Sequence, residues 1–278
     1  MSSSLDALYK NTVVNVWVED DVTRAYLKAV WKEDADIGVL IAGGWTNVAG
    51  AVEESRQGGY GNVYGCRDRD FGDSNRAQWG DASLVLFKGD AFEVENLQLD
   101  EKAIEACEVN TAGKSAADIL AAMHALATAQ VWWMACRKVL DTVMRDTTKG
   151  FPEHPPRGEI VDQASAEKMI LHDAWVLSVA STIPALVDPK TLRAALVSAH
   201  AIYDGDLKSG AWKQSFSGKE ILHEIVTWFW TSRRPSKKDG LWVDLAKAVA
   251  RAQLDQRTVP TEVTDLRAVL RAHVGLKA

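Results

Sequence analysis

Short buried runs alternate with helical patterns over roughly the first hundred residues, and this alternation constrains the fold more than any other feature of the sequence. The runs at 13–18 (VVNVWV), 37–42 (IGVLIA), 61–66 (GNVYGC) and 83–88 (SLVLFK) have the length and composition of strands. Between the first three of these runs, apolar residues recur at helical spacing. Such alternation is typical of βαβ units. The sequence therefore predicts an α/β fold, with a mostly parallel sheet of four or five strands and flanking helices.

Acidic residues directly follow two of the predicted strands. Glu19 comes after the first run, and Asp68 and Asp70 come after the third. Because the carboxyl ends of parallel strands lie at one edge of a sheet, we expect these three side chains to converge. Convergent carboxylates repel one another unless a cation lies between them, and their hard oxygen ligands suit Mg²⁺ or Mn²⁺. The pattern predicts a divalent-metal site that could activate water in phosphoryl transfer.

Four strings, VWVEDDVTRAYL, VLIAGGWTNV, VYGCRDRDFGD and FEVENLQL, resemble the Toprim fold of the overcoming-lysogenization-defect (OLD) nucleases and the related DUF4435 proteins. The resemblance covers roughly the first hundred residues. It implies that Glu19, Asp68 and Asp70 are catalytic metal ligands. The family's E-x-E-N sequence matches Glu93 and Glu95, which implies a second metal position held partly by Glu95.

One residue departs from the family pattern. Many members carry glycine directly after the first glutamate, where this chain has Asp20. Asp20 could be an added metal ligand or a solvated acid. We expect Asp21 or Thr23 to cap the helix that follows.

Three basic residues are candidates for substrate contacts. The string FSGKEIL is similar to a helix start in DUF4435 proteins, which implies that Lys219 reaches the scissile phosphate; a surface lysine is the alternative. Arg67 and Arg69 flank the acids. They could bind a substrate backbone or neutralise the acidic cluster.

From about Lys114 onward, apolar residues recur at a spacing near 3.6, which predicts a largely α-helical C-terminal region. A Pro-rich loop at 150–158 (GFPEHPPRG) interrupts it, and the basic run 233–238 is expected to be a solvated loop or a contact for nucleic acid or an acidic partner. We predict helices at 115–143, 164–181, 189–200, 218–231, 241–254 and 263–274. The predicted division is a Toprim-like metal-binding core over 1–110 and an α-helical region over 111–278, packed on that core.

Composition narrows the classes of function. The net charge of -6 gives no overall attraction for polyanions, so contacts with nucleic acid must be local. Cys66, Cys107 and Cys136 form no CxxC pair, so we expect neither a zinc ribbon nor disulfides. No signal segment or membrane-spanning stretch is expected. These features predict a cytoplasmic protein that does not bind membranes.

The predicted metal site and the resemblance to OLD nucleases together predict a metal-dependent endonuclease. Resemblance to the effectors of the PARIS class of anti-phage systems implies a toxic protein that cleaves tRNA and is controlled by a separate ABC-type ATPase. DNA as the substrate, another Toprim strand-transfer chemistry and a non-enzymatic Toprim-like interaction module are the alternatives. The aromatic residues Trp132, Trp133, Trp228, Phe229 and Trp230 lie in apolar helical stretches, where we expect them in the core or in the interface of a homodimer rather than stacked on bases.

Overall fold

The structure is a computed structural model that describes residues 7–145, 157–172, 174–180, 187–231 and 240–277. The basic run at 233–238 and most of the Pro-rich segment at 150–158 lie outside the described residues. The chain forms two compact units. The first combines Met1–Leu120 with Gly218–Ala278, and the second is Ala121–Ser217. This division differs from the predicted boundary near residue 110, because the last three helices belong to the same unit as the sheet.

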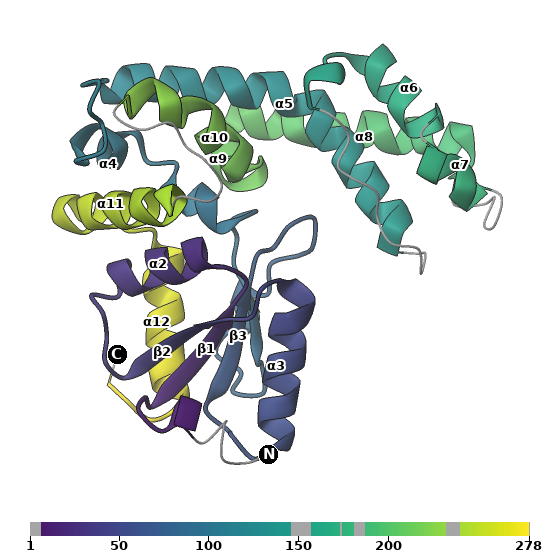
Figure 1. Cartoon of the computed structure of the whole chain (residues 1–278). Coiled ribbons are helices and arrows are strands. Elements are labelled where there is room, and N and C mark those ends of the chain that lie inside the picture. Colours follow the sequence, from purple (N-terminus) through teal and green to yellow (C-terminus); the bar gives the residue numbers. More distant parts are fainter. Residues whose placement is uncertain (1–6, 146–156, 173, 181–186, 232–239, 278) are drawn as a thin grey trace. The chain divides into compact units, whose positions relative to one another are not determined.

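The first unit contains the strands and the helices that cover them (Figure 1). In chain order its elements are β1 (Val14–Val18), α2 (Asp21–Val30), β2 (Ile37–Ile41), α3 (Trp45–Gln57), β3 (Val63–Arg67), η1 (Arg76–Gln78), β4 (Leu86–Lys88), η2 (Val94–Gln98), α4 (Glu101–Ala106), α10 (Gly218–Phe229), α11 (Leu241–Gln256) and α12 (Thr261–His273).

The strands form one four-stranded sheet in the described part of the chain, with the order β2-β1-β3-β4. All three strand pairs are parallel, which confirms the predicted α/β class. In the register of the sheet, Val18 lies opposite Ile41, and Trp17 lies opposite Gly65. The carboxyl ends of the strands therefore meet at one edge, which is the edge where Glu19 follows β1.

Each face of the sheet has its own core because side chains alternate between the faces along a strand. Val14, Val16 and Val18 of β1 point to the face covered by α2, α11 and α12. Trp17 of β1 points to the other face, where Val52 of α3 packs. Both faces are covered, as is usual for parallel sheets.

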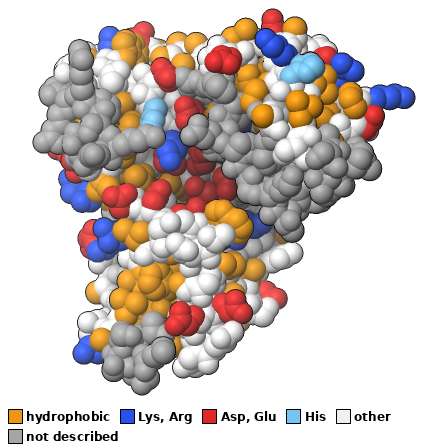
Figure 2. Space-filling model, turned by 45° about the vertical axis from the view of Figure 1, so that its right-hand side comes forward, with side chains coloured by type: hydrophobic (Ala, Val, Ile, Leu, Met, Phe, Trp, Pro, Cys, Tyr) orange, Lys and Arg blue, Asp and Glu red, His pale blue; other side chains and the backbone are white. Residues whose placement is uncertain are grey.

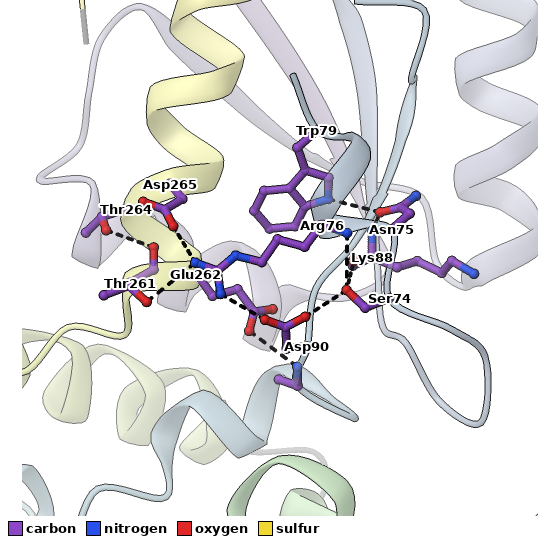
Figure 3. A network of polar contacts seen from close by, with 11 residues as sticks. Ser74, Asn75, Arg76, Trp79, Lys88, Asp90, Thr261, Glu262, Thr264 and Asp265 are labelled. Atoms are coloured by element: carbon purple, nitrogen blue, oxygen red, sulfur yellow. Dashed lines mark hydrogen bonds and ion pairs between the residues drawn. The ribbon is translucent and has the colours of Figure 1, made fainter. Parts of the chain in front are cut away.

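The last helix, α12, packs against the sheet through its apolar side chains. Polar contacts also join it to the segments around β4 (Figure 3). Arg76 of η1 donates a hydrogen bond to Asp90 at 2.8 Å and forms an ion pair with Asp265 of α12. The backbone N–H of Ala91 donates to Glu262 of α12 at 3.3 Å. These contacts place the start of α12 beside the loops that surround β4.

The second unit is helical and confirms the predicted helical region in the middle of the chain. At the helix predicted at 164–181, residues 163–172 and 174–180 are helical, and residue 173 lies outside the described residues. The helix predicted at 189–200 continues to Ser209, and the next residue, Gly210, adopts a left-handed conformation with φ of 84°. The elements are α5 (Ala116–Arg145), which begins in the first unit, η3 (Arg157–Glu159), α6 (Gln163–His172), α7 (Ala174–Ala180), α8 (Pro189–Ser209) and α9 (Trp212–Ser215).

The helix α5 differs from the expectation that no stretch is long and apolar enough to cross a bilayer. Its segment Ala116–Val143 contains a window with a mean hydropathy of 1.3, and half of that window is buried. Length and composition alone would let this helix span a membrane, but core helices of water-soluble proteins pass the same test. The finding assigns no location to the protein.

Candidate active site at the carboxyl edge of the sheet

Glu19 lies where the ends of three strands meet. It directly follows β1, and its Oε1 atom accepts a hydrogen bond of 3.1 Å from the backbone N–H of Asp68, the residue after β3. Its backbone carbonyl accepts a hydrogen bond of 3.0 Å from Gly43, which lies two residues beyond β2. Burial raises the pKa of Glu19; the hydrogen bond from Asp68 opposes this shift, and the charge of Asp70 adds to it.

Asp68 lies at the centre of the acidic group. Its Oδ1 atom accepts a hydrogen bond of 3.0 Å from the backbone N–H of Val94, so the end of β3 is bonded to η2. Burial raises the pKa of Asp68 well above its ordinary range, and the neighbouring charges of Glu95, Glu19 and Glu93 raise it further. Acids predicted to converge from separate strands are thus linked here through backbone amides.

The EVEN string forms the start of η2. Glu93 is its N-cap, and Glu93 and Asn96 form a capping box in which each side chain accepts a hydrogen bond from the other residue's backbone N–H. Glu95 is buried in the first turn. Burial raises the pKa of Glu95 to about 8; the charges of Glu93 and Asp20 add to this shift, and the charge of Lys219 opposes it.

Asp70 belongs to the same group through its charge, which raises the pKa values of Glu19 and Asp68. It has a positive φ of 49°, a left-handed conformation that aspartate tolerates better than most residues. Its backbone N–H donates a hydrogen bond of 2.9 Å to the carbonyl of Phe92. The loop after β3 is therefore bonded to the chain directly before Glu93.

Lys219 is brought to the acids by the start of α10. Its backbone N–H donates a hydrogen bond of 3.0 Å to Oε2 of Glu93. Partial burial opposes the positive charge of its side chain, but the carboxylates of Glu95, Glu93 and Asp20 outweigh that cost and raise its pKa. The implied position of Lys219 beside the acids, inferred from a string more than a hundred residues away, agrees with this geometry.

Asp20 has a structural function that we did not predict. Its Oδ1 atom accepts a hydrogen bond of 2.8 Å from the backbone N–H of Thr23, so Asp20 is the N-cap of α2. The expectation that Asp21 or Thr23 caps this helix was wrong, because both residues lie after the N-cap. The signal was present in the sequence, since aspartate is among the residues preferred at the N-cap, where its side chain accepts a hydrogen bond from a backbone N–H of the first turn.

The two arginines that flank Asp68 have different surroundings. The guanidinium of Arg67 lies over the indole ring of Trp45, 4.5 Å from its centroid, and its charge lowers the pKa of Glu19. The charge of Arg69 lowers the pKa of Asp90. Both arginines therefore partly neutralise nearby acids.

A further acid, Glu262, was not predicted as part of the site. Together with Glu19, Asp68 and Glu93 it lines a cavity of about 40 Å³ that adjoins the acidic group and is otherwise mostly apolar. Burial raises the pKa of Glu262, and the charge of Asp90 adds to the shift. Nothing in the local sequence of α12 marks Glu262, because only the packing of α12 brings it to the cavity.

Acidic side chains gather on the face of the molecule drawn in Figure 2, with a lysine or arginine beside them. As they stand, no three His, Cys, Asp or Glu side chains in the described ranges are arranged to hold one metal ion. The donor chemistry nevertheless fits a hard cation, because the group consists of carboxylates whose charges repel one another.

Comparison of the chain with family models, with curated proteins and with solved structures finds no match. The resemblance to Toprim proteins therefore stays a prediction, and the chemistry of the site is inferred from its own geometry. That geometry is a group of five carboxylates and one lysine at the carboxyl edge of a parallel sheet: Glu19, Asp68, Asp70, Glu93, Glu95 and Lys219.

Proposed function

We propose that this protein is a divalent-metal-dependent nuclease of the Toprim type, with Glu19, Asp68, Asp70 and Glu95 as its metal ligands. The observation that supports this function is the setting of Asp68, whose pKa is raised well above its ordinary range by burial and by four neighbouring carboxylates. A group of buried carboxylates that repel one another lowers the stability of the folded protein. Strongly perturbed carboxyl groups of this kind are frequent at functional sites, where a ligand compensates for the repulsion.

In this proposal, Glu19 and Asp68 each bind the cation through one carboxylate oxygen. Their hydrogen bonds to backbone amides use Oε1 of Glu19 and Oδ1 of Asp68, so the second oxygen of each could face an ion. When bound, Mg²⁺ or Mn²⁺ would lower the pKa of a water molecule and neutralise charge on a phosphodiester. Because no three acidic side chains in the described ranges are arranged around one point, metal binding in this proposal includes a movement of these side chains.

The other residues of the site have distinct functions in this proposal. Lys219, held beside Glu93 and Glu95, offers an ammonium group to a non-bridging oxygen of the scissile phosphate. Hydrolysis adds the oxygen of water to phosphorus and breaks one P–O ester bond, and the departing oxygen takes a proton. Arg67 and Arg69 flank the acids and offer contacts for the backbone of the substrate.

The substrate and the partner follow from the resemblance stated above. We propose RNA, and tRNA in particular, as the substrate, with DNA as the alternative. We also propose that a separate ABC-type ATPase controls the activity of this protein, as in the PARIS class of anti-phage systems. The net charge of -6 means that such a substrate is bound by local contacts and not by a general attraction.

The test is to incubate purified protein with Mg²⁺ or Mn²⁺ and with total cellular RNA or DNA, and then to sequence the new ends. We expect metal-dependent cleavage that falls at least about a hundredfold in Glu19→Gln and Asp68→Asn. Glu33→Gln is the matched control, because Glu33 is an exposed acid paired with Lys28 on the surface. Equal cleavage by Glu19→Gln and the control, or no metal-dependent cleavage by the natural protein, would contradict the proposal.

A further inference from the structure

An exposed tryptophan lies at the rim of the acidic site. Trp45 is the first residue of α3, and 52% of its surface is accessible to solvent. The chain just before it is bonded to the site, because the N–H of Gly43 donates to the carbonyl of Glu19 at 3.0 Å. The indole therefore stands at the same edge of the sheet as the proposed catalytic carboxylates.

The ring of Trp45 is paired with Arg67, the last residue of β3 and the neighbour of Asp68. The guanidinium carbon lies 4.5 Å from the ring centroid, a cation–π contact. The buried Nε of Arg67 has no hydrogen-bond partner among the described residues. The contact with the indole therefore helps to orient this guanidinium.

We propose that Trp45 and Arg67 form a stacking platform for an unpaired nucleobase of a single-stranded nucleic acid. This inference rests on the proposed function and names the form of its substrate. Flat indole and guanidinium groups stack on bases of any sequence, and bases expose their flat faces only where the strand is unpaired. A base held at Trp45 would place its own backbone beside Glu19 and Asp68.

Single exposed tryptophans are common on protein surfaces, so the position of this one carries the argument. The chain offers a matched control in Trp228 near the end of α10, which is 36% exposed and has Lys114 over its ring at 4.4 Å. Trp228 lies nine residues beyond Lys219 along the helix, about 13 Å at 1.5 Å per residue. It has the same chemistry but lies away from the acids.

The experiment measures binding without cleavage. Fluorescence anisotropy is recorded in EDTA for a labelled single-stranded RNA of about 12 nucleotides and for a duplex of the same sequence. We expect Trp45→Ala to weaken binding of the single strand about tenfold, within the range measured for base–aromatic stacking. Trp45→Phe should keep binding within about threefold, because it retains a flat ring. Trp228→Ala should change the affinity for the single strand by less than about twofold. Trp45→Ala should change the affinity for the duplex by less than about twofold.

Two results separate this inference from the proposed function. If the natural protein cleaves nucleic acid but Trp45→Ala binds the single strand as tightly as Trp228→Ala does, the stacking platform is wrong and the nuclease stands; Trp45 would then serve another contact, such as a protein partner. If no cleavage is found but Trp45→Ala alone weakens single-strand binding, the platform stands and the nuclease is wrong. Failure of the natural protein to bind the single strand at all overturns the platform.

Discussion

Two aspartates of the first unit, Asp68 and Asp34, show opposite electrostatic settings. Asp68 is surrounded by other acids, which raise its pKa well above the ordinary range after the larger effect of burial. Burial also acts on Asp34, but hydrogen bonds and charges from Arg267 and Arg271 of α12 outweigh it and lower the pKa of Asp34. One carboxylate therefore opposes folding at neutral pH, and the other supports it.

This contrast predicts opposite effects of the same substitution. Asp68→Asn keeps an oxygen for the N–H of Val94 but removes a repelled charge, so we expect the metal-free protein to melt at least about 2 °C higher while cleavage is lost. Asp34→Asn should lower the free energy of unfolding by about 1–3 kcal/mol and leave cleavage intact, because two arginines lose their charged partner. Calorimetry and cleavage assays on both variants test this. A destabilised Asp68→Asn protein would show that the acids are not under strain.

The acidic group also predicts the pH dependence of stability. Burial and nearby charges raise the pKa of Glu95 from the ordinary 4.5 to about 8, so the folded protein favours its neutral form. The stabilisation from this group is complete below pH 4.5 and is lost as the pH rises through about 8. We expect the melting temperature of the metal-free protein to be lower at about pH 9 than at about pH 6.

Added Mn²⁺ should raise the melting temperature more at about pH 9 than at about pH 6, because ionised carboxylates bind the cation. Glu95→Gln should reduce both the difference in melting temperature between the two pH values and the difference in the stabilisation by Mn²⁺. Thermal melts at the two pH values, with and without Mn²⁺, measure these differences. If the natural protein in EDTA is more stable at the higher pH, the raised pKa of Glu95 is contradicted.

At the scale of elements, the contact between α10 and η2 determines where Lys219 lies. Gly218 is buried against η2, and a Cβ atom on it would lie 2.5 Å from the backbone nitrogen of Asn96. Real Cβ atoms do not approach backbone atoms so closely, so another residue would push the start of α10 away. The glycine of the FSGKEIL string thus allows the lysine after it to reach Glu93.

Gly218→Ala should therefore lower both stability and cleavage, by at least about 1 kcal/mol and about tenfold, because it displaces Lys219 from the acids. Gly50→Ala is the control. Gly50 lies within α3, and a Cβ there would meet no atom within 4 Å, so alanine should stabilise the helix by about 0.5–1 kcal/mol. Chemical denaturation and cleavage rates distinguish the two variants. Unchanged cleavage by Gly218→Ala would show that Lys219 does not need this position.

At the scale of the whole molecule, the sheet and its last helices form one unit although the second unit lies between them in the sequence. Val263, Leu266 and Leu270 of α12 are buried against the face of the sheet to which Val14, Val16 and Val18 of β1 point. Each such side chain stabilises a fold by about 1.5–3 kcal/mol, so their sum is comparable with the whole stability of a domain.

A protein that ends at Gln256 should consequently fail to fold its sheet, because α12 covers one face and pairs with Asp34. Circular dichroism and hydrogen exchange of the amides in β1 would measure this. Native exchange protection of β1 without α12 would show that the sheet does not depend on the C-terminal helix.

The sequence by itself determined the α/β class, the four strands and the edge at which Glu19 and Asp68 meet. These features follow from local periodicity and from the geometry of parallel strands, which needs no knowledge of distant contacts. Residues close in sequence to a strand end, such as Asp70, could therefore be assigned to the site. The cap of α2 was local too, and only the choice of Asp20 was missed.

Only the tertiary structure decided which distant segments complete the site. Glu262 enters the cavity, and Trp45 stays exposed beside Arg67, because of how helices pack on the sheet. The place of Lys219 was implied by the resemblance of its string, but its contact with Glu93 depends on the same packing. Such packing depends on the shape and burial of whole faces, and no periodicity within a single segment contains that information. The physical reason is that strand periodicity and helix capping are short-range, whereas the convergence of segments distant in sequence is a property of the assembled core.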